Sequence, residues 1–122
     1  MSENKSKMYI LIRDDVDLGH AILASAHASL GGYLTFKEND DEHTIDTLDK
    51  YVKESFRKVV CKVTREEFDK AKTYGNNMED YRIMVESGLG GMEVAIVVRP
   101  RNTSDDNSFN HFLKSLQLYK QY

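Results

Sequence analysis

The chain of 122 residues contains one cysteine, one proline and no tryptophan. A single thiol excludes an internal disulfide and favours a reducing compartment. No apolar run reaches the length that spans a bilayer, and residues 1–7 are polar with no signal-peptide core behind them. We therefore expect a cytoplasmic protein with no membrane partner. It should form a single domain over residues 1–122, because this length can bury one core.

An excess of charge of one sign is also missing, since 17 Lys and Arg residues face 20 Asp and Glu residues. Proteins dedicated to nucleic acids usually carry a basic excess. The basic residues are nevertheless concentrated between Lys53 and Lys72. This stretch predicts either a patch that binds phosphates, with Lys58 and Lys62 as contacts, or the solvated edge of a strand and a helix.

Patterns for metals and cofactors are absent too. Cys61, His43 and His111 are isolated in the sequence, so we expect no metal site. The glycines of residues 88–91 are followed by neither a helix nor a Lys-Ser/Thr pair, which excludes a phosphate-binding loop and leaves a tight turn. We expect no bound cofactor.

What the sequence does contain is an alternation of strand and helix patterns. Residues 8–12 form an apolar run with the length of a buried central strand. Residues 18–33 follow with Leu18, Ile22 and Leu30 at helical spacing and small alanines between them, which let a helix lie close to a sheet. The polar loop between strand and helix therefore sits where α/β proteins bind ligands.

Further elements are predicted along the rest of the chain. They are a helix from Thr44 or Asp46 to about Glu54, a strand over 57–63, a helix that begins at a Thr64–Glu67 capping box and ends at Gly75, strands over 81–85 and 92–98, and a C-terminal helix after residues 105–108. The predicted fold class is α/β, with three layers (α/β/α), a mixed sheet of about four strands and an extra C-terminal helix.

The predicted C-terminal helix carries an apolar stripe at helical spacing, formed by Phe109, Phe112, Leu113, Leu116 and Tyr119. A stripe of this size is too apolar to remain in water. We expect it to pack on the sheet or on a second subunit, so a homodimer stays open.

Residues 8–33 resemble the opening of the type 2 peptidyl-tRNA hydrolases. That family begins with a strand written roughly M-Y-I-L-V-R-D-D-L, followed by G-x-G-K-x-A-A-Q-x-x-H-A. This chain has MYILIRDDV, then Gly19, then His27-Ala28. The resemblance implies a single peptidyl-tRNA hydrolase type 2-like domain, a tRNA partner, and hydrolysis of the ester bond of peptidyl-tRNA or of a modified aminoacyl-tRNA.

The sequence departs from the family pattern at chemically important positions. The family's lysine falls on His20 and its glutamine on Ala24. Glu86 replaces an aspartate, and the short segment 89–91 replaces a threonine-rich loop. These departures leave a second interpretation open, in which the chain is a non-catalytic module of the same fold that binds a small ligand, RNA or a protein.

The catalytic candidates are His20, Glu86 and Asp14. His20, at the start of the first helix, is either an acid-base group or an exposed histidine. Glu86 either orients a water molecule or is an exposed turn carboxylate. Asp14 either faces the cleft or caps the end of the strand.

The substrate-binding candidates, besides Lys58 and Lys62, are Gly19, His27 and Gly88. Amides near Gly19 would help to stabilise an oxyanion. His27 projects from nearly the same helix face as His20, and we interpret it as a partly buried core residue. Gly88 belongs to the turn that resembles part of the family's site.

Overall fold

The computed structural model describes residues 5–38 and 42–119, without the side chains of residues 42–45. His43, which is isolated from other metal-ligating residues in the sequence, therefore lies outside the described side chains. The main strands are β1 (Ser6–Arg13), β2 (Arg57–Val63), β3 (Tyr81–Glu86) and β4 (Met92–Val98). They form one sheet in the order β2-β1-β4-β3, in which β1 and β2 are parallel and the other neighbours are antiparallel. The sheet is mixed, as predicted.

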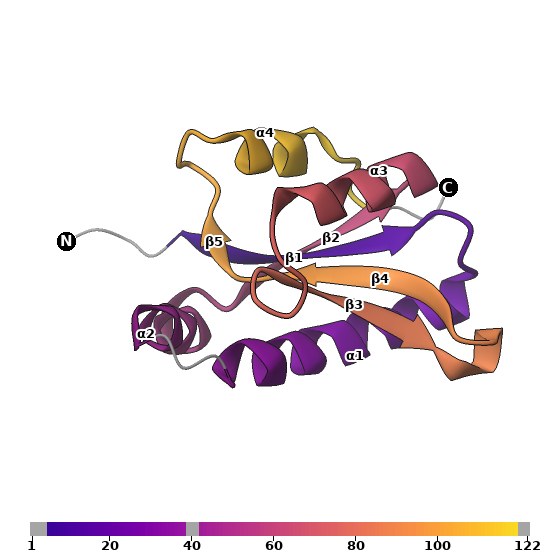
Figure 1. Cartoon of the computed structure of the whole chain (residues 1–122), viewed down its shortest axis with the longest axis horizontal. Helices are drawn as coiled ribbons and strands as arrows, with labels where there is room; N and C mark the ends of the chain where they lie inside the picture. The colour runs from indigo at the N-terminus through magenta and orange to yellow at the C-terminus, as the bar shows by residue number, and fades with distance from the viewer. Residues whose placement is uncertain (1–4, 39–41, 120–122) are drawn as a thin grey trace.

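Helices cover both faces of this sheet (Figure 1). One layer holds α1 (Leu18–Lys37) and α2 (Glu42–Lys50), and the opposite layer holds α3 (Arg65–Ala71) and α4 (Ser108–Ser115). The three-layer arrangement with a C-terminal helix is therefore confirmed. A short strand, β5 (Arg101–Asn102), pairs with the beginning of β1 and was not predicted.

β1 is buried on both sides, which fits its place in the middle of the sheet. Met8, Ile10 and Ile12 point into the core beneath α1. Tyr9 and Leu11 point into the core beneath α3 and α4. The predicted central strand is confirmed, and its last residue leads directly into the loop before α1.

The side of α1 that faces the sheet is made of small residues. Ala21, Ala24 and Ala28 are buried there, whereas Leu18, Ile22 and Leu30 are 41%, 62% and 61% exposed. Further along the helix, a Cβ added to Gly32 would come within 2.7 Å of Val97 Cγ2. The helix thus lies close to the sheet, and its large apolar side chains lie beside that contact rather than in it.

Local interactions determine where helix α3 begins and how strand β3 connects to strand β4. Thr64 and Glu67 form both hydrogen bonds of a capping box at the start of α3, as predicted. The chain then passes through one 3₁₀ turn, η2 (Lys72–Tyr74), and reaches Gly75. β3 and β4, the strands predicted over 81–85 and 92–98, form a hairpin through a second 3₁₀ turn, η3 (Ser87–Leu89), and two glycines with positive φ.

The helix α4 packs on the sheet, but it is shorter than predicted. Phe109, Phe112 and Leu113 are buried against β1, β2 and α3 side chains. The helix ends at Ser115, and residues 117–119 run beside β2, where the Tyr119 N–H donates to Val60 O at 2.9 Å. The prediction that Tyr119 lies on the helix is wrong, because an extended segment can pair with the otherwise unpaired edge of β2.

Candidate functional site

A carboxylate and an imidazole form a pair at the beginning of α1. Asp17 is the N-cap of the helix, and its Oδ2 accepts the His20 backbone N–H at 3.2 Å. The other oxygen, Oδ1, lies 2.7 Å from His20 Nδ1. These hydrogen bonds from His20 hold the pKa of the Asp17 carboxyl below its ordinary value. When Nδ1 carries the hydrogen, Nε2 is left with a free lone pair, which is the form that a general base requires.

The turn after β3 presents a second carboxylate. Glu86 ends the strand, and its Oε1 accepts the Gly88 N–H at 3.0 Å, so the side chain caps the 3₁₀ turn η3. Glu86 is half-buried and Gly88 is exposed. The carboxylate therefore has a structural task in the turn while it remains open to solvent.

The structure brings this turn next to His20. A Cβ added to Gly88 would lie 3.7 Å from His20 Nε2 and 3.2 Å from Glu86 Oε1. Gly88 thus leaves open the space that Nε2 faces, with the Glu86 carboxylate at its border. Three sequence candidates from two distant segments, His20, Glu86 and Gly88, therefore form one group at the carboxyl end of β1.

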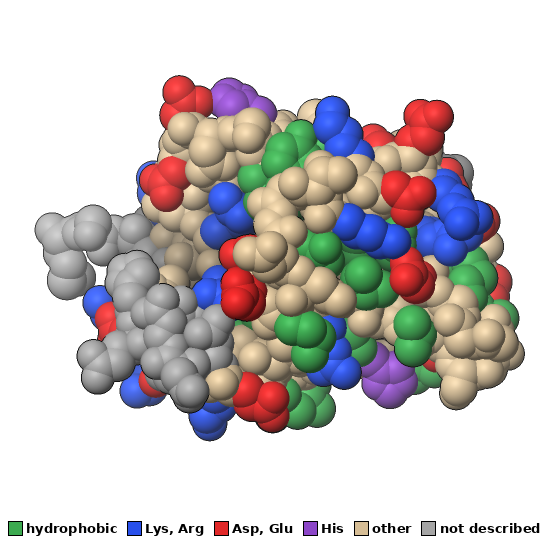
Figure 2. Space-filling model, viewed as in Figure 1, with side chains coloured by type: hydrophobic (Ala, Val, Ile, Leu, Met, Phe, Trp, Pro, Cys, Tyr) green, Lys and Arg blue, Asp and Glu red, His purple; other side chains and the backbone are tan. Residues whose placement is uncertain are grey.

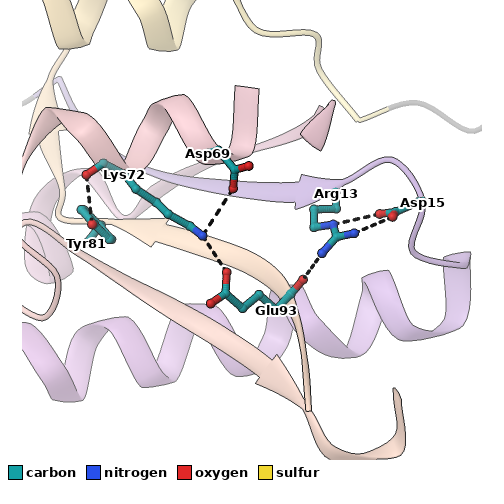
Figure 3. A network of polar contacts seen from close by, with 6 residues as sticks. All are labelled: Arg13, Asp15, Asp69, Lys72, Tyr81 and Glu93. Carbon is teal, nitrogen blue, oxygen red and sulfur yellow. Dashed lines mark hydrogen bonds and ion pairs between the residues drawn. The ribbon is translucent and has the colours of Figure 1, made fainter. Parts of the chain in front are cut away.

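A polar network fixes the loop that leads to this group (Figure 3). The buried guanidinium of Arg13 binds the Asp15 carboxylate through two hydrogen bonds of 3.0 and 2.6 Å, and it donates to Glu93 O at 3.1 Å. These bonds lower the pKa of Asp15. The Glu93 carboxylate binds Lys72 Nζ at 2.7 Å. The end of β1 is thereby tied to the beginning of β4, the strand that follows the Glu86–Gly88 turn.

Asp14 lies in different surroundings. Its backbone N–H donates to Val63 O at 2.8 Å and so extends the pairing of β1 with β2. Its exposed side chain lines a polar cavity of about 450 Å³ together with Lys62, Thr64, Glu67, Ser115 and Gln117. None of these five residues belongs to the group around His20, so Asp14 lines a cavity of its own at the end of β1.

The other two residues of α1 that were singled out are both exposed. Gly19 lies in the first turn, and among the described residues its N–H has no hydrogen-bond partner, as is usual for the first amides of a helix. His27 is also exposed, and the prediction that it is a partly buried core residue is wrong. The alanine face of α1 makes the sheet contact, whereas His20 lies beside that face, next to the turn after β3, and His27 is exposed to solvent.

Lys58 and Lys62 belong to β2 and not to the turn that carries Glu86. Lys58 Nζ lies 3.2 Å from the centre of the Phe56 ring, and Lys62 Nζ lies 5.4 Å from that of Tyr119. Lys72, from the same basic stretch, is paired with Asp69 and Glu93. Basic and acidic side chains are interspersed on the face that Figure 2 shows. Between Lys58 and Lys72, the lysines of this stretch are distributed over β2, α3 and η2.

Asp17 belongs to this group but was not among the residues predicted from the sequence. The signal was present as an Asp three positions before a His at the start of a helix, which is the spacing of an N-cap and its N3 residue. In the part of the chain that the structure describes, no three His, Cys, Asp or Glu side chains gather in a way that holds a metal ion. None of the described helices has the length and apolar character to cross a membrane.

Comparison with known families gives one match that spans nearly the whole chain. The family model described as "Peptidyl-tRNA hydrolase PTH2" matches residues 6–119. The matched region includes α4, the helix that was predicted as an extra C-terminal element. No curated protein sequence matches the chain.

Proposed function

The chain belongs to the PTH2 peptidyl-tRNA hydrolase family, and we propose that it hydrolyses the ester bond between a peptide, or a modified aminoacyl group, and the end of tRNA. The observation that carries this proposal is the Asp17–His20 pair, whose Nε2 faces the space beside Gly88. An imidazole held by a carboxylate is a common arrangement for moving protons near neutral pH.

In the proposed reaction, His20 Nε2 takes a proton from a water molecule as the water oxygen attacks the ester carbonyl. Asp17 keeps the ring oriented and stabilises the imidazolium that forms. The C–O bond to the ribose then breaks, and His20 returns the proton to the leaving ribose oxygen. The products are the free carboxylic acid and tRNA with its terminal hydroxyl restored.

One backbone amide and one side-chain carboxylate complete the proposed site. The free N–H of Gly19 is suited to stabilise the negative charge on the carbonyl oxygen, because helix N-termini favour anions. The Glu86 carboxylate borders the same space and is suited to hold the attacking water. Asp14 lines its own cavity with Lys62, and we assign neither residue a chemical step.

Binding of tRNA is the second half of the proposal, with Lys62 and Lys58 as phosphate contacts. Such contacts make affinity fall steeply as salt rises, because binding releases counterions from the nucleic acid. Lys62→Glu should weaken tRNA binding and flatten its salt dependence relative to the parent. We place this activity in the cytoplasm, in agreement with the one buried thiol.

The direct test is the release of labelled peptide from peptidyl-tRNA, with aminoacyl-tRNA as the comparison substrate. The proposal expects release that scales with protein concentration and depends on the acylated tRNA. Saturable tRNA binding without release would support the alternative of a non-catalytic module, which the replacement of the family's lysine by His20 and its glutamine by Ala24 favours.

A further inference from the structure

A second cavity lies on the other flank of α1, away from His20. It occupies about 280 Å³ between the C-terminal half of α1, the edge of β2 and the π-helical turn η1 (Tyr51–Ser55). Its walls are mainly apolar side chains, among them Leu30, Tyr33, Val52 and Phe56. Leu30, Val52 and Phe56 are 61%, 37% and 58% exposed, so large apolar surfaces here face solvent. This is the composition of a site for a small ligand with an apolar body.

The backbone that carries Phe56 into the cavity wall has an uncommon conformation. A π-helical turn precedes Phe56, and Phe56 itself has φ 53, in the left-handed region that a bulky side chain rarely adopts. Its N–H donates to Tyr51 O at 2.7 Å, and Tyr51 OH donates to Arg57 O at 2.9 Å. These bonds tie the backbone of Phe56 and Arg57 to Tyr51, and both Tyr51 and Phe56 line the cavity. Strained backbone of this kind is concentrated at functional sites.

One cation lies in this apolar wall. Lys58 Nζ lies 3.2 Å from the centre of the Phe56 ring and 5.7 Å from that of Tyr51, and it donates to Phe56 O at 3.1 Å. The ion pairs among the described residues do not include this ammonium group. Burial lowers the pKa of Lys58, because desolvation penalises its charged form. An anion in the cavity would offset that penalty. The hydroxyl of Ser29, also in the wall, is a second polar group.

We infer that this cavity binds a small organic carboxylate with an apolar body, whose carboxylate pairs with Lys58 and whose body lies between Leu30 and Phe56. The single ammonium group is complementary to one carboxylate, and the apolar walls favour an aromatic or aliphatic skeleton. The cavity is separate from the proposed hydrolytic group, since none of its lining residues lies beside His20 or Glu86. It shares Lys58 with the proposed tRNA contacts, so the carboxylate and a tRNA phosphate would compete for this ammonium group.

The test uses the full chain, 4-phenylbutyrate as probe and 4-phenyl-1-butanol as its neutral counterpart, followed by amide chemical shifts in NMR titrations. The acid should produce saturable shifts around Ala26, Ser29 and Phe56, with an affinity at least about tenfold above that of the alcohol, because a charge-assisted contact is added. Lys58→Met should reduce the affinity for the acid to that for the alcohol, whereas Lys58→Arg should retain the difference.

Two control variants separate the effect of the Lys58 charge from the effect of the space inside the cavity. Lys53→Met removes a lysine from the exposed face of the same π turn and should leave both affinities at the parental values. Ala26→Leu fills the cavity from an exposed helix position and should abolish binding of both compounds. The inference is overturned if the acid gives no saturable shifts, if acid and alcohol bind the parent equally, or if the shifts are centred on His20 and Glu86.

Discussion

The two flanks of α1 differ in how their side chains are satisfied. On the flank next to β3, His20 is hydrogen-bonded to Asp17, and the Glu86 carboxylate is engaged by the Gly88 amide. On the flank next to β2, large apolar side chains are exposed around a cavity, and Lys58 lies against aromatic rings. A single helix with a small-residue face can therefore support a polar group on one side and an apolar cavity on the other. We propose proton transfer for the first flank and binding of an apolar ligand for the second.

The largest expected effects come from removing the two side chains that act on the water in the proposed reaction. His20→Ala should reduce the hydrolysis of peptidyl-tRNA by at least about a hundredfold, the usual scale for losing an acid-base group, and Glu86→Gln should cause a similar loss because the carboxylate that holds the attacking water is removed. Single-turnover rates measure this effect. The matched control is His111→Ala, because His111 forms a similar exposed pair with Asp106 at 2.6 Å on the opposite layer. Equal losses in His20→Ala and His111→Ala would show that the site is misplaced.

The close contact between Gly32 of α1 and Val97 of the sheet lies between the two flanks, and the free energy of unfolding tests it. In Gly32→Ala the new Cβ would lie 2.7 Å from the stiff Val97 side chain. Overpacking costs about 1–3 kcal/mol, and the better helix propensity of alanine offsets about 1 kcal/mol, so the free energy of unfolding should fall by up to about 2 kcal/mol.

The control for that change is Gly31→Ala. Its Cβ would meet the ends of the long Met84 and Arg82 side chains at 3.1 and 3.2 Å, and these need to shift by only a few tenths of an ångström, so this variant should lose less stability than Gly32→Ala. Urea unfolding of both variants measures the difference. If Gly32→Ala is the more stable of the two, the close approach of α1 to the sheet is not the constraint described.

A smaller effect is expected from narrowing the space that His20 faces. Gly88→Ala places its Cβ 3.7 Å from His20 Nε2, an ordinary contact distance, and should reduce turnover by less than about tenfold. Gly88→Val adds two methyl groups to the same space and should reduce turnover further. Binding of 4-phenylbutyrate on the other flank, measured in parallel, should not change. A valine variant as active as the parent would mean that the substrate does not enter this space.

The smallest effect concerns acid stability. The folded-state pKa of Asp17 lies below its ordinary value of 3.8, so the carboxylate stabilises the fold above that value and this stabilisation is lost as pH falls through the lowered pKa. Asp17→Asn should therefore melt below the parent at neutral pH, and the difference should shrink below about pH 3.8. A difference in melting temperature that stays constant down to the most acidic folded condition would contradict this.

Much of the fold could be predicted because local patterns and packing agree. The strand over 57–63 and the capping box at Thr64 match the structure at the residue level, since alternation and N-cap chemistry are local signals. The C-terminal segment could not be predicted in the same way. Tyr119 continues a helical apolar spacing, yet the chain leaves the helix after Ser115 to pair with the edge of β2, a contact between distant segments.

The sequence likewise pointed to some members of the candidate group and not to others. The resemblance pointed to His20 and Glu86, and the hairpin turn brings Gly88 beside the first of them. The burial of His27 was predicted wrongly, because helical spacing shows which residues share a face of the helix but not which face contacts the sheet. Asp17 was missed because an aspartate before a helix indicates a cap, and its second bond to an imidazole depends on side-chain geometry.

The most direct test of the central claim is the pH dependence, between about pH 5 and 8, of the single-turnover rate of peptidyl-tRNA hydrolysis by the parent chain. A general base must be neutral, so the rate should rise with pH across this range and reach a plateau. This rise should be absent from the residual activity of His20→Ala. A rate that falls over the same range would assign His20 the role of a positive charge, and the absence of hydrolysis at every pH would contradict the proposed activity.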